Sequence, residues 1–134
     1  MSQERVKLVE QLIEAFNARD VDGFLRLTTE DFEWFTSVMA VEGEVFVGRE
    51  GIETYFQRMR DAWDEFVGLL EVWNDLGDRI LVSGHLEGRG RGSGVKVLAP
   101  WDVLYEFRGE KISLMHSFLD HDEALRAAGL ADDG

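Results

Sequence analysis

The chain has 134 residues, of which 45% are hydrophobic and 11% aromatic, and it contains no cysteine. This composition excludes a disordered chain, a disulfide framework, a thiolate metal site and a cysteine nucleophile. The formal net charge of −13 at pH 7 would repel a phosphate backbone, so we expect no nucleic-acid partner. The sequence shows neither an apolar run long enough to span a bilayer nor the apolar segment of a signal peptide. We therefore expect no membrane partner and a cytoplasmic protein.

The first half of the chain is predicted to be mostly helical. Apolar residues recur at helical spacing in residues 5–20 and 50–63, which is typical of helices with one buried face. Residues 20–28 indicate a second, short helix, for which Asp20 is the candidate N-cap. Residues 32–38 are aromatic and β-branched, which favours a strand between the helices.

The second half of the chain changes to strand patterns. Residues 120–129 close the chain as a short helix, with Asp120 as candidate N-cap and Gly129 as candidate C-cap. Helices followed by mostly antiparallel strands predict one α+β domain over residues 1–134. Four strands are expected in this half: residues 66–73, 79–88, 95–107 and 111–119.

The stretch GRGRGSGV, residues 88–95, raises the question of a phosphate-binding loop. A dinucleotide fingerprint needs a glycine where Ser93 or Val95 stands, and a P-loop needs a Gly-Lys-Ser/Thr run that this stretch lacks. The segment that follows is a predicted strand, and not a helix whose N-terminus could hold phosphate. We therefore expect a turn between two strands, with phosphate binding through Arg89 and Arg91 as the alternative.

Several segments resemble a known family: EAFNARDVDGFLRLTTEDFEW, VGREGIETYF, GRGRGSGV and FRGEKISLMHSFLDHDEALRAAGL. Together with the order of the elements, they make residues 6–130 resemble the SnoaL-like polyketide cyclases and ketosteroid isomerase-like proteins of the nuclear transport factor 2-like superfamily. The resemblance implies an α+β fold in which a cone-shaped, curved, mostly antiparallel sheet packs against N-terminal helices, as in a cystatin-like roll. It also implies an apolar interior that binds a small hydrophobic molecule, isomerase, cyclase or lyase chemistry in some members, and pairing into homodimers.

The catalytic residues of ketosteroid isomerases are missing at the matching positions. Leu12 stands where the resemblance places the tyrosine of the oxyanion hole. Thr36 and Val103 stand where it places the base aspartate and the protonated aspartate. We therefore expect no steroid-type proton transfer by that set of residues.

The register of the predicted strand 79–88 decides which of its side chains face the interior. A comparison with limonene epoxide hydrolases places Gly84 and Leu86 at the positions of their paired catalytic residues. A slip of one residue, which glycine corners permit, turns His85 and Glu87 inward instead. This pair could act as a general base and is the candidate catalytic pair, so both registers stay open at this point.

Large apolar and aromatic side chains are predicted to line the interior and to hold a small hydrophobic molecule by area burial and stacking. No cofactor is expected, and no metal site, because the three histidines lack the spacing of metal ligands. The candidate substrate-binding residues are Trp34, Thr36, Tyr55, Met59, Trp63, Trp101, Val103, Tyr105, Met115 and Ser117.

The opposite face of the sheet is predicted to bear Leu104, His116 and Phe118. Apolar side chains there would be left in water in a monomer, so we expect a homodimer through this face. A non-catalytic interaction or accessory domain that acts through the same face is the alternative function.

Overall fold

In a computed structural model, which describes residues 2–36 and 45–130, most helices come in the first half of the chain and four consecutive strands in the second half. Every helix and strand predicted from the sequence is found, although residues 37 and 38 of the first predicted strand lie outside the described residues. Strand β2 is an addition, because three residues are too few to show a strand pattern. The elements are α1 (Ser2–Ala18), α2 (Val21–Arg26), β1 (Thr28–Phe35), β2 (Val45–Val47), α3 (Gly48–Ala62), β3 (Trp63–Asp75), β4 (Arg79–Gly90), β5 (Lys96–Arg108), β6 (Lys111–Phe118) and α4 (His121–Ala127).

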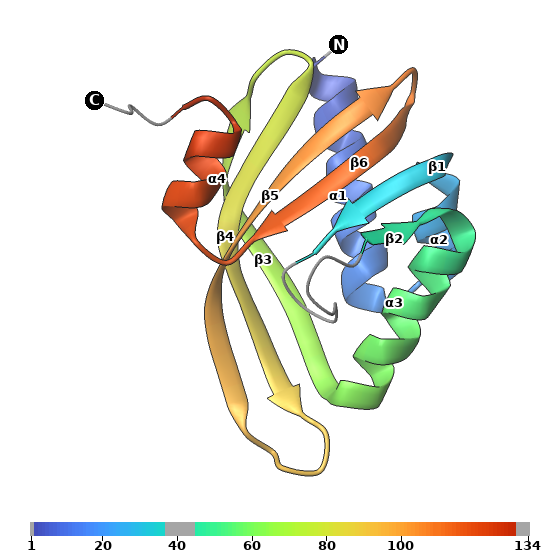
Figure 1. Cartoon of the computed structure of the whole chain (residues 1–134), viewed down its shortest axis with the longest axis vertical. Helices are drawn as coiled ribbons and strands as arrows, with labels where there is room; N and C mark the ends of the chain where they lie inside the picture. The colour runs from blue at the N-terminus through green and yellow to red at the C-terminus, as the bar shows by residue number, and fades with distance from the viewer. Residues whose placement is uncertain (1, 37–44, 131–134) are drawn as a thin grey trace.

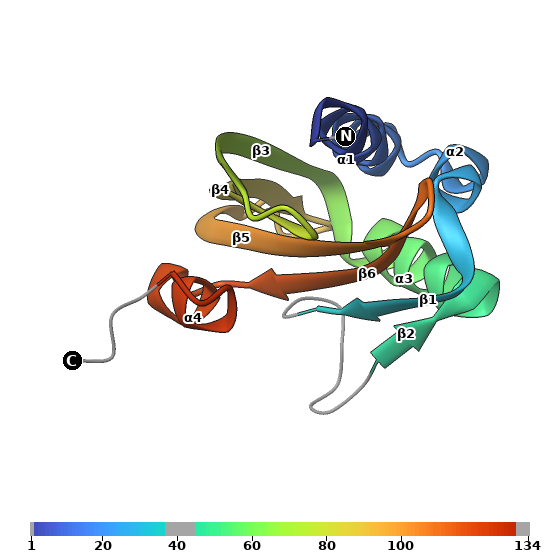
Figure 2. The same ribbon diagram turned by 90° about the horizontal axis from the view of Figure 1, so that it is seen from above.

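The strands form one curved sheet in the order β2-β1-β6-β5-β4-β3 (Figure 1). β1 and β6 are parallel, and the other neighbours are antiparallel. α1, α2 and α3 lie on one side, which we call the inner face, and α4 lies on the other side, the outer face (Figures 1 and 2). The predicted α+β fold, with N-terminal helices packed against a curved, mostly antiparallel sheet, is therefore confirmed. The sheet is open, with β2 and β3 as its edges.

The inner face and the helices enclose an aromatic core around Phe16 of α1, which is 1% exposed. Its ring contacts the rings of Trp34, Tyr55, Phe56, Phe66 and Trp101. These side chains come from β1, α3, β3 and β5. One side chain of α1 therefore joins this helix to three strands and to α3, by contacts that each contribute beyond simple area burial.

The edge strand β3 is bound to α1 by side-chain hydrogen bonds. Asn17 Oδ1 accepts a hydrogen bond from Gly68 N at 2.9 Å, and Asn17 Nδ2 donates one to Gly68 O at 3.0 Å. Just past the other end of β3, Arg5 Nη1 donates to Gly77 O at 3.0 Å. Packing also requires a glycine at position 68, because a Cβ there would lie 2.2 Å from the Trp101 ring. The two bonds to Gly68 satisfy backbone groups that an edge strand would otherwise leave open.

Replacing Asn17 by alanine is expected to lower the free energy of unfolding by about 1–3 kcal/mol, because it removes both hydrogen bonds to Gly68. Gln11→Ala, on the exposed side of the same helix, is the matched control and should change it by less than about 0.5 kcal/mol. Urea denaturation followed by circular dichroism measures both values. If the two variants lose equal stability, the edge bonds contribute nothing.

The GRGRGSGV stretch forms the end of β4 and the turn into β5, as predicted. Gly92 and Gly94 have positive φ angles of 84° and 69°, which glycine adopts without strain. Arg91 ties this turn to α3: its backbone N donates to Ala62 O and its Nε donates to Arg60 O, both at 2.9 Å. The side chain of Arg91 therefore satisfies a carbonyl that the C-terminal end of a helix leaves unpaired.

Candidate functional site

The inner face carries a row of three side chains in lateral register. Trp34 of β1 pairs with Met115 of β6, and Met115 pairs with Tyr105 of β5. Neighbouring strands lie about 4.8 Å apart, so Met115 has one large aromatic side chain on each side. All three are at most 1% exposed. The row therefore belongs to the fully buried interior.

Tyr55 of α3 covers this row from the helix side. Its ring stacks on that of Trp34, with centroids 3.9 Å apart, and its hydroxyl is hydrogen-bonded to Thr36. Burial raises the pKa of Tyr55, and burial likewise raises the pKa of Tyr105. Both phenols therefore keep their protons near neutral pH and can act as hydrogen-bond donors.

Two polar atoms of this row, Trp34 Nε1 and Tyr105 OH, are buried without a hydrogen-bond partner among the described residues, and we call them the donor pair. An unpaired buried donor costs about 1–3 kcal/mol, and native proteins keep few of them. Trp63 Nε1 is unpartnered in the same way. Trp63 pairs with Gly90, however, at the opposite end of β4 from Ile80, the partner of Tyr105. Trp63 is therefore not part of the same site.

The structure places the other predicted binding residues on or beside the inner face and packs them closely. Trp101 pairs with Gly84 part-way along β4, and its ring stacks on Phe16. Thr36 and Trp63 are half-buried. The interior is packed with its own side chains, since the remaining predicted residues are at most 4% exposed: Trp34, Tyr55, Met59, Trp101, Val103, Tyr105, Met115 and Ser117.

His85 and Glu87 face outward. Leu86, which stands between them on β4, is 4% exposed and belongs to the inner core, so strand alternation turns its two neighbours to the outer face. His85 Nδ1 lies 3.1 Å from a carboxylate oxygen of Glu71, and His85 Nε2 lies 3.8 Å from one of Glu87. The register that would turn this pair inward is not the one that forms, and the two residues lie on the outer face beside the carboxylate of Glu71.

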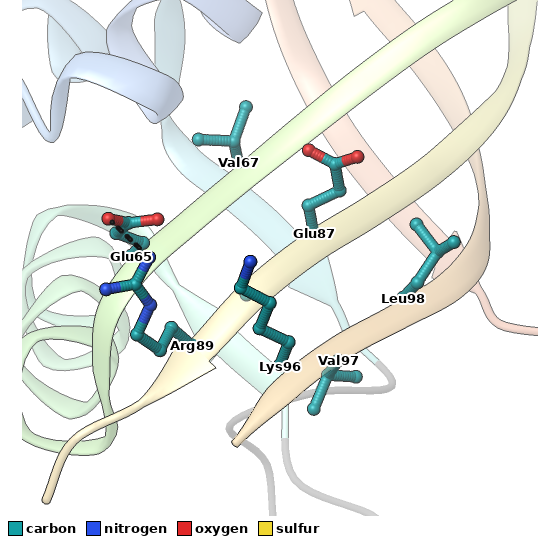
Figure 3. A pocket seen from close by; sticks show the side chains of 8 residues that line it. Glu65, Val67, Glu87, Arg89, Lys96, Val97 and Leu98 are labelled. Atoms are coloured by element: carbon teal, nitrogen blue, oxygen red, sulfur yellow. Dashed lines mark ion pairs between the residues drawn. The ribbon is translucent and has the colours of Figure 1, made fainter. Parts of the chain in front are cut away.

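A trough of about 370 Å³ crosses β3, β4 and β5 on the outer face (Figure 3). Val67, Val97 and Leu98 supply its apolar part, and Leu98 is 70% exposed. Arg89 pairs with Glu65 at 3.3 Å. The trough therefore combines apolar surface with charges of both signs. Its lining residues are Glu65, Val67, Glu87, Gly88, Arg89, Lys96, Val97 and Leu98.

α4 covers another part of the outer face. Leu104 packs with Ala124 and Ala128 of the C-terminal segment and is only 4% exposed. The expectation that Leu104 is left in water is therefore wrong, because the last helix of the same chain covers it. Phe118 is half-buried and stacks on His116, with ring centroids 4.2 Å apart. The docking of so short a helix leaves no signal in its local sequence.

A buried carboxylate lies under the N-terminal end of α4. Asp102 is 2% exposed, and its Oδ2 accepts a hydrogen bond from Ser83 Oγ at 2.9 Å and lies 2.5 Å from His121 Nδ1. Asp120, the predicted N-cap, accepts a hydrogen bond from Asp122 N. Strand alternation had placed Asp102 on the face opposite Val103, but the sequence offered no sign of His121 as its partner. The pair holds α4 on the sheet, since a buried carboxylate needs polar partners.

Few ionisable side chains are buried in the described part of the chain. The buried polar residues there are Thr28, Ser83, Asp102 and Ser117. Across residues 2–36 and 45–130, no group of three or more His, Cys, Asp or Glu side chains is arranged to hold a metal ion. None of the helices described is long and apolar enough to cross a membrane.

A known protein family matches most of this sequence. The SnoaL-like domain family matches residues 9–115, which is most of the sequence. This chain belongs to the SnoaL-like family. No curated protein matches it.

Solved structures of similar fold cover nearly the whole SnoaL-like chain. An NTF2-like protein of unknown function from Burkholderia pseudomallei is 19% identical, with a TM-score of 0.78 over 92% of this chain and 95% of that one. A putative polyketide cyclase from Xanthomonas campestris pv. campestris is 22% identical, with a TM-score of 0.71 over 94% and 97%. A protein with a ketosteroid isomerase-like fold from Catenulispora acidiphila, in complex with trimethylamine, is 19% identical, with a TM-score of 0.74 over 95% of each chain. At these identities the similarity shows the fold alone.

In this SnoaL-like protein, the positions that match the catalytic residues of ketosteroid isomerases carry apolar side chains or a hydrogen-bonded hydroxyl. Leu12 and Val103 are buried in the inner core, at 1% and 0% exposure. Thr36 is hydrogen-bonded to Tyr55. These three positions therefore supply hydrophobic contacts and one hydroxyl, and none of them carries an acid or a base.

His116 makes stability depend on pH. It lies between the rings of Phe35 and Phe118, and burial lowers its pKa, against the smaller opposing effects of Glu106 and Glu123. The folded state therefore favours the neutral imidazole, while the unfolded chain binds a proton near the ordinary pKa of about 6.5. The stability that His116 contributes is complete above about pH 6.5 and is lost as the pH falls toward its lower pKa in the folded state.

We expect the free energy of unfolding to decrease between about pH 7.5 and pH 5.5 in the natural chain and to decrease less in His116→Phe, which keeps an aromatic ring and cannot bind a proton. Urea denaturation at several pH values measures both slopes. Asp31, whose pKa is lowered mainly by its hydrogen bond with Arg108, loses its contribution at more acidic pH and stays out of this range. Equal slopes would contradict the assignment to His116.

Proposed function

We propose that this SnoaL-like protein binds a small apolar molecule in its interior, against the row of Trp34, Met115 and Tyr105. The observation that carries the proposal is the donor pair, Trp34 Nε1 and Tyr105 OH, buried without a partner. A chain that needed only a stable core would gain from apolar groups there, because an unpaired buried donor destabilises the fold. A ligand that accepts a hydrogen bond in the interior would remove this cost.

The walls of the interior suit such a ligand. Trp34 is stacked between Tyr55 and Phe24, with ring centroids at 3.9 and 5.0 Å, and flat aromatic walls bury a large apolar area. Met59 and Met115 are the adaptable members, because methionine is unbranched and turns about three bonds. The interior is packed in this structure, so binding requires these two methionine side chains to repack around the ligand.

The proposal concerns binding and assigns no catalytic step. The isomerase, cyclase or lyase chemistry found in the family needs a positioned acid or base, and the candidate pair His85 and Glu87 faces outward. The descriptions of two structural neighbours, a putative polyketide cyclase and a protein in complex with trimethylamine, support a small-molecule role for the fold. A cytoplasmic location is part of this proposal.

Replacing Tyr105 by phenylalanine is expected to raise the free energy of unfolding by about 0.5–1.5 kcal/mol and to weaken ligand binding about tenfold, because it removes only an unpartnered hydroxyl. Tyr55→Phe is the matched control. Its hydroxyl is bonded to Thr36, so the same change should lower stability by a similar amount. Urea denaturation measures stability, and equilibrium dialysis with acetylnaphthalene, a neutral aromatic ketone, measures binding.

Two results would count against the interior site. If Tyr105→Phe is more stable but binds the ketone as well as the natural chain does, the hydroxyl is only a packing defect. If Tyr105→Phe is less stable, its hydroxyl has a partner in solution and the donor pair does not exist as described. The free energy of unfolding is expected to rise in Tyr105→Phe and to fall in Tyr55→Phe. A general effect of replacing tyrosine by phenylalanine would change both in the same direction.

A second function, association with another copy of this chain, is supported by the outer face. Leu98, which lines the trough, is 70% exposed, and Leu69 and Val72, further along β3, are 39% and 58% exposed. The trough carries acidic and basic side chains together. A two-fold interface needs such a patch, because one surface must complement itself. We propose a homodimer through this part of the outer face, in place of the Leu104 region that α4 covers, with an interaction or accessory role as the alternative function.

Leu98→Glu is expected to convert the homodimer to a monomer, because it places two like charges in one interface, one from each copy. Val47→Glu is the matched control, because Val47 is 50% exposed and lies on the edge strand β2, away from the trough. This change should leave the mass of the homodimer unchanged. Sedimentation equilibrium measures the mass of each variant. A natural chain that stays monomeric at high micromolar concentration would rule out the homodimer.

A further inference from the structure

Asp102 and His121 form a hydrogen-bonded pair in which one side chain is buried and the other is exposed. The exposed fractions are 2% for Asp102 and 54% for His121. Asp102 Oδ2 lies 2.5 Å from His121 Nδ1 and also accepts a hydrogen bond from Ser83 Oγ. An ionised carboxylate can only accept, so the proton of the neutral imidazole stays on Nδ1. In residues 2–36 and 45–130, His121 Nε2 has no hydrogen-bond or ion-pair partner. Its lone pair is therefore free to act on a molecule from solvent.

The other two histidines of the chain, which also lie in the described part, lack this combination. Both ring nitrogens of His85 lie beside carboxylates, at 3.1 Å from Glu71 and 3.8 Å from Glu87. The ring of His116 is half-buried between two phenylalanine rings. Of the three histidines, only His121 has a carboxylate on one ring nitrogen and an open second nitrogen. A nucleophilic histidine requires this arrangement, because the carboxylate orients the ring and leaves Nε2 unprotonated.

The pair has apolar neighbours in its own row of the outer face. Asp102 pairs with Ser83 on one side and with Phe118 on the other, and Ser83 pairs with Val72 of β3. Side chains paired across neighbouring strands share a face of the sheet. Val72 is 58% exposed and Phe118 is half-buried. An organic molecule beside His121 therefore has apolar surface to contact.

Acidic side chains set the charge that such a molecule meets. Asp120, Asp122 and Glu123 are exposed and adjacent to His121 in the sequence, and the whole chain carries a formal net charge of −13. A negative field raises the local concentration of cations and lowers that of anions. An uncharged or cationic molecule is therefore favoured over an anionic one.

We propose that His121 is the nucleophile of a second site, on the outer face and separate from the proposed interior site, that hydrolyses uncharged or cationic aryl esters. Nε2 attacks the acyl carbon and forms a C–N bond, while the C–O bond breaks and the phenolate leaves with its electron pair. A phenolate departs without a proton, so no acid is needed beside Nε2. The acylated ring is positively charged, and the carboxylate of Asp102 on Nδ1–H stabilises it. Asp102 acts through His121 and is a positioning residue.

Water completes the reaction. It attacks the acyl carbon, the C–N bond breaks with its electron pair returning to Nε2, and a proton of the water passes to solvent. One ester and one water thus give a carboxylate, a phenolate and two protons less any that solvent buffers, and His121 is regenerated with its proton still on Nδ1. No oxidant or reductant takes part.

Hydrolysis of 4-nitrophenyl acetate by the full chain tests the proposal. We expect steady-state turnover at least about tenfold faster than with free imidazole at the same concentration, because the ring is oriented and its charged form is stabilised. His121→Gln should remove this excess rate. His85→Gln is the matched control and should keep the natural rate, since both nitrogens of His85 already lie beside carboxylates. One equivalent of diethyl pyrocarbonate, located by peptide mass spectrometry, should label His121 first and stop turnover in proportion.

Asp102→Asn tests the positioning role. Asparagine keeps the shape of the side chain and removes its charge, so kcat should fall at least about tenfold while KM changes little, because Asp102 does not touch the ester. Nitrogen NMR of the imidazole should show the proton of His121 on Nδ1 in the natural chain and a loss of that preference in the variant. If Asp102→Asn does not fold by circular dichroism, the spectrum of the natural chain still decides, since a proton on Nε2 would overturn the proposal.

Two further esters test the preference for charge: the cationic 4-(trimethylammonio)phenyl acetate and the anionic 4-sulfophenyl acetate. Each rate is divided by that of free imidazole with the same ester, which removes differences in intrinsic reactivity. At low ionic strength the quotient of the anionic ester should be about tenfold below that of the cationic ester, and salt should reduce the difference.

The outcomes are distinct. If the natural chain is no faster than free imidazole, if His121→Gln keeps the natural rate, or if pyrocarbonate labels another histidine first, His121 is not the nucleophile of such a site. If the quotients of the two charged esters are equal, the nucleophile stands and the preference for charge is wrong.

Discussion

The burial of Phe16 is the constraint on which the two layers of this fold depend. Its ring meets β1, α3, β3 and β5 together, with centroid separations of 5.5 to 6.3 Å. Replacing a buried phenylalanine by alanine typically lowers the free energy of unfolding by about 3–5 kcal/mol. At Phe16 all the neighbouring rings would lose contacts together. The same placement of α1 lets Asn17 reach the edge of β3, where Gly68 also leaves space for the ring of Trp101. Helix position, sheet edge and aromatic packing are therefore parts of one arrangement.

Strand alternation divides the polar chemistry of the molecule between its two faces. On the outer face, charged groups have partners: His85 lies beside Glu71, and Asp102 beside His121. On the inner face, the buried side chains are mostly apolar or aromatic, with Ser117 among the few polar ones, and the donor pair is left without partners. We therefore propose association for the outer face and binding of a small apolar molecule for the inner face.

Stability and binding are in conflict at the donor pair. Tyr55 and Tyr105 are both fully buried aromatic residues on the same interior, yet only the hydroxyl of Tyr55 has a protein partner. A core selected for stability alone would satisfy both hydroxyls or lose the second one. Native proteins accept such local costs where function requires them. The contrast between the two tyrosines is therefore the observation behind the proposed binding in this interior.

The sequence by itself determined the elements, because these depend on the spacing of neighbouring residues. Helical periods in residues 5–20 and 50–63 placed α1 and α3, and the missing glycine at Ser93 or Val95 correctly reduced a suspected phosphate loop to a turn. Alternation along the later strands also put Trp101, Val103 and Tyr105 on one buried face. The burial of these side chains could therefore be predicted, whereas the partners of their polar atoms could not.

Tertiary structure alone decided the register of β4, the docking of α4 and the donor pair. A slip of one residue exchanges Leu86 for His85 on the inner face, and pairing across three strands fixes that choice. The cover over Leu104 comes from residues about twenty positions later in the chain, at Ala124. Whether a buried hydroxyl such as that of Tyr105 finds a partner depends on the side chains that distant segments bring within 3.5 Å of it, which no local pattern records.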